Sequence, residues 1–150
     1  MGKKYNVILN SNFGNGALTN NKSYCVNWSN IPDDKKLKLT WSFTSSSNFA
    51  YNPGLINYVF CDIGQPEQIF ATNNSLRNAR YDCLGSMKLT ASTGKYAIFA
   101  CDTRANPPLF LDRRPSNNII NITIITGNIN QIQGAINPDN YTLILSFEEL

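Results

Sequence analysis

The 150-residue sequence contains no histidine, so it lacks the side chain that most often serves as a general base, a metal ligand or a member of a catalytic triad. Only 15% of the residues are charged, and the formal net charge is +3. This low and mixed charge argues against a disordered chain and against a nucleic-acid-binding protein. No run of 18 apolar residues occurs, and the first residues lack the apolar core of a signal peptide. We therefore expect no membrane span and synthesis in the cytoplasm.

Motifs that carry catalysis are also missing from the sequence. It has no GxGxxG, P-loop, GxSxG or HExxH pattern. A cysteine nucleophile would have no histidine to activate it. A glycosidase needs only two facing carboxylates, and Asp62, Asp82, Asp102 and Asp112 could approach one another in space. No pattern favours that arrangement, and the prediction is a protein that is not an enzyme and that holds no cofactor or metal.

Four widely spaced cysteines stand at Cys25, Cys61, Cys83 and Cys101, without a CxxC pair. A zinc site would need all four thiolates at an unusual spacing. In a reducing compartment such cysteines are usually buried and act as small apolar side chains. We expect this, with one or two disulfides formed late as the alternative.

What the sequence does contain is 22 asparagines and 15 isoleucines, residues typical of turns and of strands respectively. Apolar residues recur with a period of two, most clearly over residues 37–43. There Leu37, Leu39, Trp41 and Phe43 alternate with polar residues such as Lys38, which predicts a strand with one buried and one wet face. The lysines on the polar face protect against edge pairing in this interpretation.

The same reading predicts further strands, and no window of ten residues has the pattern of an amphipathic helix. The best candidate for a helix, residues 73–81, is short, and the longest loops are expected at residues 45–55 and 127–140. A chain of this length fits one domain, residues 1–150, with a single core. The prediction is an all-β, antiparallel β-sandwich of the jelly-roll kind with about eight to ten strands. Its strands are expected at residues 5–9, 24–28, 37–43, 56–63, 68–71, 86–89, 96–101, 109–112, 120–124 and 141–147.

The most distinctive segment is residues 106–118, NPPLFLDRRPSNN. Two prolines impose an extended entry, and two arginines follow a short apolar run. One interpretation is an elaborate connection between strands. The other is a rigid segment whose arginines pair with carboxylates of a partner. The predicted contact residues are Pro107, Pro108, Arg113, Arg114, Pro115, Asn117 and Asn118. Ile119 and Ile125 are also candidates to face a partner.

Four segments together give the chain a family resemblance: residues 26–32 (VNWSNIP), 37–45 (LKLTWSFTS), 106–118 and 141–148 (YTLILSFE). The chain resembles small minor capsid or penton-type virion proteins of large icosahedral double-stranded DNA viruses, which accompany a double jelly-roll major capsid protein. The resemblance implies a structural protein in the virion, assembled in the host cytoplasm. It would cement capsomers or fill the space between them, in contact with the major capsid protein, other minor capsid proteins and further copies of itself. The four cysteines depart from the family pattern.

A second function class remains open from the residues themselves. Asparagine-rich loops with an exposed aromatic residue, such as Tyr51 near Asn48 and Asn52, are typical of a lectin-like or host-attachment module that binds carbohydrate. An exposed aromatic ring at one end of the sandwich and a glycan-array signal would favour this alternative.

Overall fold

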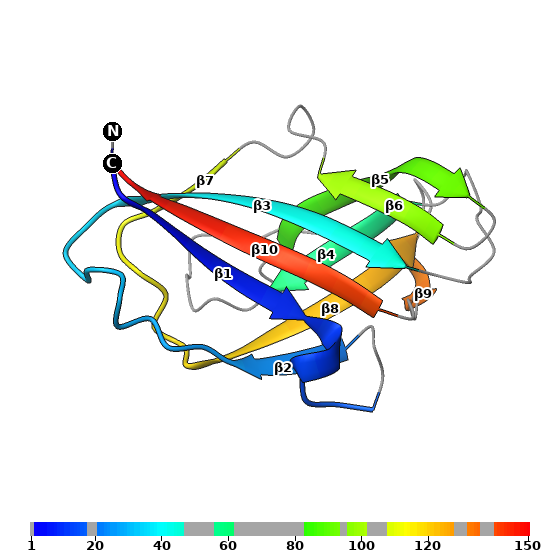
Figure 1. Cartoon of the computed structure of the whole chain (residues 1–150), viewed down its shortest axis with the longest axis horizontal. Coiled ribbons are helices and arrows are strands. Elements are labelled where there is room, and N and C mark those ends of the chain that lie inside the picture. Colours follow the sequence, from blue (N-terminus) through cyan, green and yellow to red (C-terminus); the bar gives the residue numbers. More distant parts are fainter. Residues whose placement is uncertain are drawn as a thin grey trace.

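Ten β-strands form two antiparallel sheets in the computed structural model, which describes residues 2–17, 21–46, 56–61, 83–93, 96–101, 108–127, 132–135 and 140–150. One sheet has the order β1-β10-β3-β7, and the other has the order β2-β8-β4-β5-β6 with β9 also paired to β8. Figure 1 shows the first sheet lying across the second. The elements are β1 (Lys4–Asn10), the 3-10 turn η1 (Ser11–Phe13), β2 (Asn21–Cys25), β3 (Leu37–Ser46), β4 (Ile56–Cys61), β5 (Cys83–Thr93), β6 (Tyr96–Cys101), β7 (Leu109–Leu111), β8 (Ile119–Gly127), β9 (Ile132–Ala135) and β10 (Asn140–Glu149).

The strand order is that of a jelly roll. Without the short β9 and the added strand β6, eight strands remain in two four-stranded sheets, β1-β10-β3-β7 and β2-β8-β4-β5. Strands that follow one another in the chain mostly change sheet, as the two interlocked Greek keys of this fold require. The predicted all-β antiparallel sandwich is confirmed.

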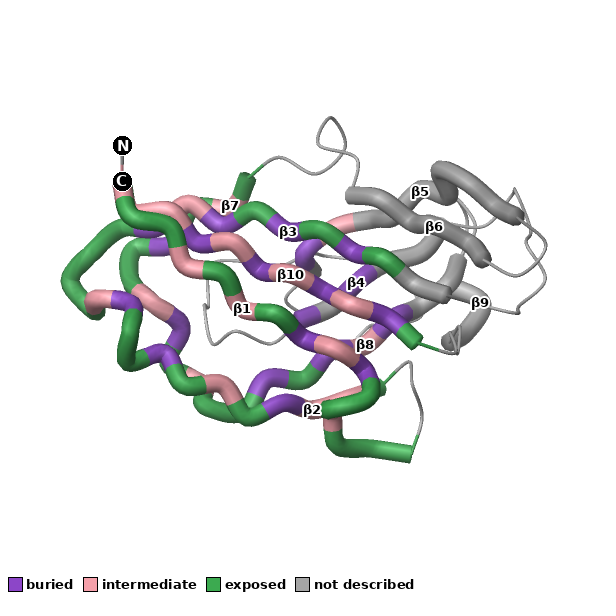
Figure 2. Tube along the Cα trace, viewed as in Figure 1, coloured by how far each residue is buried: buried purple, intermediate pink, exposed green. Residues whose placement is uncertain are grey.

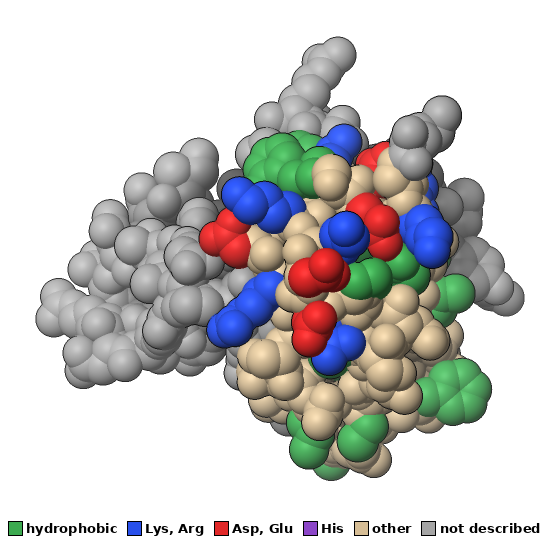
Figure 3. Space-filling view, turned by 90° about the vertical axis from the view of Figure 1, so that its left-hand side faces the viewer, with side chains coloured by type: hydrophobic (Ala, Val, Ile, Leu, Met, Phe, Trp, Pro, Cys, Tyr) green, Lys and Arg blue, Asp and Glu red, His purple; other side chains and the backbone are tan. Residues whose placement is uncertain are grey.

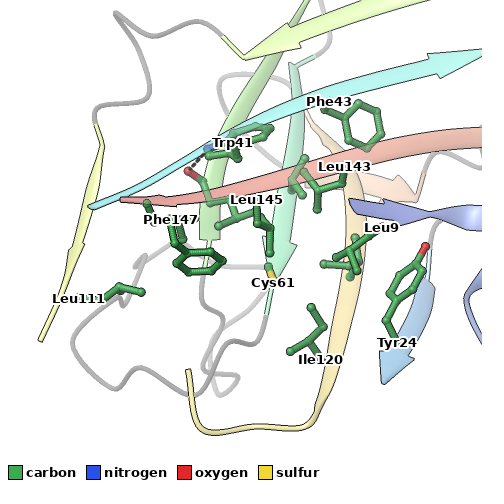
Figure 4. Close-up of a cluster of buried hydrophobic side chains, with 14 of the residues drawn as sticks. Leu9, Tyr24, Trp41, Phe43, Cys61, Leu111, Ile120, Leu143, Leu145 and Phe147 are labelled. Atoms are coloured by element: carbon green, nitrogen blue, oxygen red, sulfur yellow. Dashed lines mark hydrogen bonds between the residues drawn. The ribbon is translucent and has the colours of Figure 1, made fainter. Parts of the chain in front are cut away.

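Alternation along the central strands builds the core. On β3, Leu37, Leu39, Trp41 and Phe43 are buried, whereas Thr40 is exposed. β10 alternates in the same way along its length (Figure 2). The inward side chains of both sheets meet in one cluster, part of which is shown in Figure 4. Burial of alternate apolar side chains is the main stabilising term of such a sandwich.

Buried hydrogen bonds cross between the sheets. The indole Nε1 of Trp41 on β3 donates to the Leu84 carbonyl oxygen on β5 at 3.1 Å (Figure 4). The hydroxyl of Tyr24 on β2 donates to the hydroxyl of Tyr141 on β10 at 2.8 Å. Burial raises the pKa of both tyrosines, so both hydroxyls are protonated at neutral pH. These bonds satisfy polar atoms that large aromatic side chains bring into the core.

Some predicted boundaries were wrong. The strand expected at residues 24–28 is β2, which begins at Asn21 and ends at Cys25. Trp28 is buried without being in a strand, because its indole anchors a loop. Residues 127–140 were expected to be a loop, yet they contain β9. The predicted strand at 68–71 and the helix candidate at 73–81 lie outside the described residues.

Of the cysteines, Cys61 is buried in the core as expected. The expectation was wrong for Cys25, which is exposed and forms no disulfide. The side chain of its neighbour Tyr24 on β2 faces the core. Because side chains alternate between the two faces of a strand, that of Cys25 faces outward. The side chains of Cys83 and Cys101 are not among those described.

Candidate partner-contact site

Four segments meet at the end of the sandwich where both chain termini lie (Figure 1). They are residues 2–4, the β2–β3 loop at 26–36, the β7–β8 segment at 112–118, and residues 148–150. Backbone hydrogen bonds join them: the amide of Leu150 donates to the Lys36 carbonyl at 3.0 Å, and that of Val26 to the Asn118 carbonyl at 2.7 Å. We call this region, together with Lys38 at the start of β3, the charged end.

Most of the charged residues that the structure describes gather there. Among the charged residues whose side chains the structure describes, only Lys22 lies elsewhere. Figure 3 shows acidic and basic side chains interspersed over this end. The seven basic residues are Lys3, Lys4, Lys35, Lys36, Lys38, Arg113 and Arg114, and the five acidic residues are Asp33, Asp34, Asp112, Glu148 and Glu149.

The ion pairs at the charged end are long and at least partly exposed to solvent. Glu148 lies between Lys4 and Lys38, at 3.9 and 4.0 Å, and Lys36 lies 3.8 Å from Asp112. Exposed pairs of this kind contribute about 0–1 kcal/mol each. Their side chains can therefore exchange these contacts for a partner's charges at little cost.

The predicted contact residues divide into two groups. Pro108, Arg113 and Asn118 are exposed. Arg114 and Asn117 are half-buried, and Pro115 is buried; Pro107 lies outside the described residues. Ile119, which follows them, is 59% exposed, as its position in the sequence suggested. The side chain of Ile125 is not among those described.

Hydrogen bonds explain why the second group is withdrawn from the surface. Arg114 donates through Nη1 to the Ile31 carbonyl at 2.9 Å and to the Trp28 carbonyl at 3.4 Å. The Trp28 indole in turn donates to the Asn117 carbonyl at 2.6 Å, and its ring packs edge-on against Phe147. These contacts fasten the β7–β8 segment to the β2–β3 loop. Arg114 thus makes intramolecular contacts, whereas Arg113 extends from the same rigid segment into solvent.

Between the two loops lies an open hollow of about 380 Å³. Trp28 and Pro115 contribute apolar atoms to it. The other lining groups are amides, hydroxyls, guanidinium groups and one carboxylate, from Asn27, Ser29, Asp33, Arg113, Arg114, Ser116 and Asn118. This set offers hydrogen-bond donors and acceptors, and a guanidinium that can pair with a carboxylate.

The sequence analysis missed Asn27, Ser29 and Asp33 as part of this hollow. They reach it because β2 pairs with β8, with Cys25 opposite Ile119, which brings the loops after β2 and before β8 together. No local pattern predicts that pairing, since residues 25 and 119 are far apart in the chain.

No group of three potential metal ligands occurs among the described residues. Of the four carboxylates of the glycosidase alternative, Asp112 is exposed and lies beside Lys36, and the other three lie outside the described residues. Tyr51, Asn48 and Asn52 of the carbohydrate-binding alternative also lie outside them. Within the described part of the chain, no helix has the length and apolar character needed to cross a membrane.

Comparison of the chain with protein-family models and with curated proteins found no match. The resemblance to virion proteins therefore stays a prediction.

Proposed function

We propose that the protein is a structural component of an icosahedral virion, a minor capsid protein that cements major capsid capsomers or fills the space between them. In this proposal it resides in the capsid, is assembled in the host cytoplasm and works through surface contacts without catalysing a reaction. The observation that carries the proposal is the charged end, a rigid surface with an exposed arginine beside a polar hollow.

The fold is compatible with this role, because jelly rolls recur in capsid proteins and in lectins. A shared fold does not by itself establish a function. More specific support comes from the four segments that carry the family resemblance. β3 pairs with β10, and the loop at residues 26–32 is hydrogen-bonded to the segment at 112–118. The segments thus form two contiguous regions of the molecule.

Contacts at the charged end would act by charge pairing and by exclusion of water. A stable specific interface buries on the order of 1,000 Å² in total or more. Interspersed charges select neighbours with the complementary pattern and disfavour others. Repetition in a symmetric shell strengthens contacts that are individually weak. In this mechanism Arg113 pairs with a carboxylate of a neighbouring capsid protein, and the hollow receives polar side chains beside it.

Charge reversal of Arg113 tests the proposal. We expect Arg113→Glu to reduce incorporation of the protein into purified particles at least tenfold. Lys22→Glu, which makes the same change of charge away from the charged end, should be incorporated nearly normally. Cross-linking of particles followed by mass spectrometry should join Lys3, Lys35 or Lys36 to the major capsid protein. Equal incorporation of both variants, or absence of the protein from particles, would refute the proposal.

The carbohydrate-binding alternative makes a different prediction. An isolated protein that gives a glycan-array signal, lost on Tyr51→Ala, would favour the lectin-like module. Turnover of a substrate by the free monomer would instead show that it is an enzyme.

A further inference from the structure

The outer edge of β1 is less protected against pairing with another strand than two other sheet edges in the described part of the chain. β7 has three residues and follows the exposed Pro108. β2 is covered by its own preceding loop, where Asn15 and Ser23 exchange two backbone hydrogen bonds of 2.8 and 2.9 Å. β1 has seven residues, and β10, on its inner side, is the only strand among the described residues that pairs with it.

The register shows which backbone groups of β1 point outward. The amide of Glu149 donates to the Lys3 carbonyl at 3.0 Å, so the backbone hydrogen-bonding groups of Lys3 face β10. Antiparallel ladders alternate, and the pairing of β1 with β10 continues without a bulge. The N–H and C=O groups of Lys4, Asn6 and Ile8 therefore face away from β10, whereas Asn10 at the end of the strand also caps η1. No described residue hydrogen-bonds to them as a neighbouring strand would.

β1 carries few of the features that prevent edge pairing. It contains no proline or glycine, and its only charge, Lys4, stands at its first position beside Glu148. Ile8, in the outward-facing set, is 65% exposed. Long, regular and partly apolar edges of this kind are templates for the addition of another strand.

The shape of the molecule decides what can be added. Figure 1 shows β2 and the loop after it projecting beyond the outer edge of β1, in the other layer. A second copy paired through its own β1 would be related by a twofold axis perpendicular to the sheet. Paired strands are only about 4.8 Å apart, so the projecting β2 layers of the two copies would collide. A single extended segment has no such layer.

We propose that β1 binds an extended segment of another protein chain, which adds as an antiparallel strand to the sheet β1-β10-β3-β7. The segment has apolar side chains at alternate positions, because they would lie beside the half-buried Tyr5 and Val7 and the buried Leu9. It has an acidic residue near its C-terminal end, opposite the exposed Lys4. This inference depends on the register of β1, the exposure of its edge and the shape of the molecule, and it does not rest on the proposed function.

The probe is the synthetic peptide acetyl-Thr-Val-Thr-Val-Thr-Val-Glu-amide. Antiparallel pairing places its glutamate opposite Lys4 and its valines beside Tyr5, Val7 and Leu9, so its threonine amides face β1. In the free protein, amide hydrogen exchange should be fast at Asn6 and Ile8 and slow at Tyr5 and Val7. Saturating peptide should slow exchange at Asn6 and Ile8 at least tenfold. Slow exchange of all four amides in the free protein, or failure of the peptide to bind at about 1 mM, would overturn the inference.

Matched variants of both molecules complete the test. Ile8→Pro removes an outward N–H that pairs with no strand among the described residues, so the variant should fold and should bind the peptide at least tenfold more weakly. Ile8→Thr keeps that N–H and should bind within about threefold of the native protein. N-methylation of the peptide's threonine amides should abolish binding, whereas N-methylation of its valine amides should not, and this comparison needs no protein variant. Equal effects of the two methylation patterns, or a native dimer that Ile8→Pro dissociates, would contradict the proposed occupant.

Discussion

The two adjacent arginines of the β7–β8 segment should differ sharply in their effect on stability. Arg114 donates to the Ile31 carbonyl at 2.9 Å and to the Trp28 carbonyl at 3.4 Å, and is half-buried. Arg113 is exposed, and its side chain has no comparable contact with the β2–β3 loop in the described part of the chain. Substitution of each by methionine removes the guanidinium and keeps most of the aliphatic chain, which isolates the hydrogen bonds from the packing.

The expected magnitude follows from this geometry. A hydrogen bond from a charged donor contributes about 1.5–3 kcal/mol, and the longer of the two bonds lies near the limit of the useful range. Partial exposure of Arg114 lowers the total, so Arg114→Met should reduce the free energy of unfolding by about 1–2 kcal/mol. In a chain of this size the melting temperature would fall by about 2–8 °C. Arg113→Met, a surface change, should stay within about 0.5 kcal/mol of the native protein.

Urea unfolding followed by tryptophan fluorescence measures both variants. Trp28 lies in the affected loop, and Trp41 lies in the core and reports the global transition. An unchanged slope against urea would show that the unfolded states are comparable. A loss of stability in Arg113→Met that equals or exceeds the loss in Arg114→Met would refute the assignment of the intramolecular role to Arg114.

Three further outcomes follow from the fold. Gly16→Ala should destabilise the protein by about 1 kcal/mol or more in urea unfolding, because Gly16 has a φ of +130° and an added Cβ would lie 2.7 Å from the Asn21 carbonyl oxygen. Tyr141→Phe should cost about 1–2 kcal/mol by the same assay, because it leaves the buried Tyr24 hydroxyl without its acceptor. Burial raises the pKa of both tyrosines, so above pH 10.0, the value for an unperturbed tyrosine, the unfolded chain loses these protons first. The free energy of unfolding should therefore be insensitive to these groups below that pH and decrease above it; a rise between about pH 10 and 11 would contradict the assignment.

Alternation in the sequence was sufficient to predict the strands whose two faces see different surroundings. Leu39 and Thr40 on β3 show why. The inner face of the strand packs against the other sheet and the outer face contacts solvent, so apolar and polar residues alternate along it. Alternation of apolar and polar residues did not identify β9, because that strand is short and is interrupted by Gly134. It also misassigned Trp28, because burial of an aromatic side chain does not require a strand beneath it.

The candidate site was predicted only in part. The sequence analysis identified the segment at residues 112–118 from its prolines and arginines, but local chemistry does not distinguish Arg113 from Arg114. That distinction depends on which guanidinium meets the carbonyls of Trp28 and Ile31, more than 80 residues earlier in the chain. The pairing of Cys25 with Ile119 creates this meeting, and it is a property of the whole sheet.

Long-range pairing also determines the inferred strand-addition edge. The alternation of residues 4–10 predicts which side chains of β1 face the core, but it does not predict which backbone amides face the open edge of the sheet. The outward set of amides follows from the hydrogen bond between the Glu149 amide and the Lys3 carbonyl together with the register of β1 on β10, and a shift of one residue would exchange the two sets of amides. A one-residue shift would also turn Leu9 toward solvent. Burial of Leu9 in the core therefore fixes the register of β1. That register keeps the backbone amides of Asn6 and Ile8 at the open edge of the sheet, where they can bind another chain.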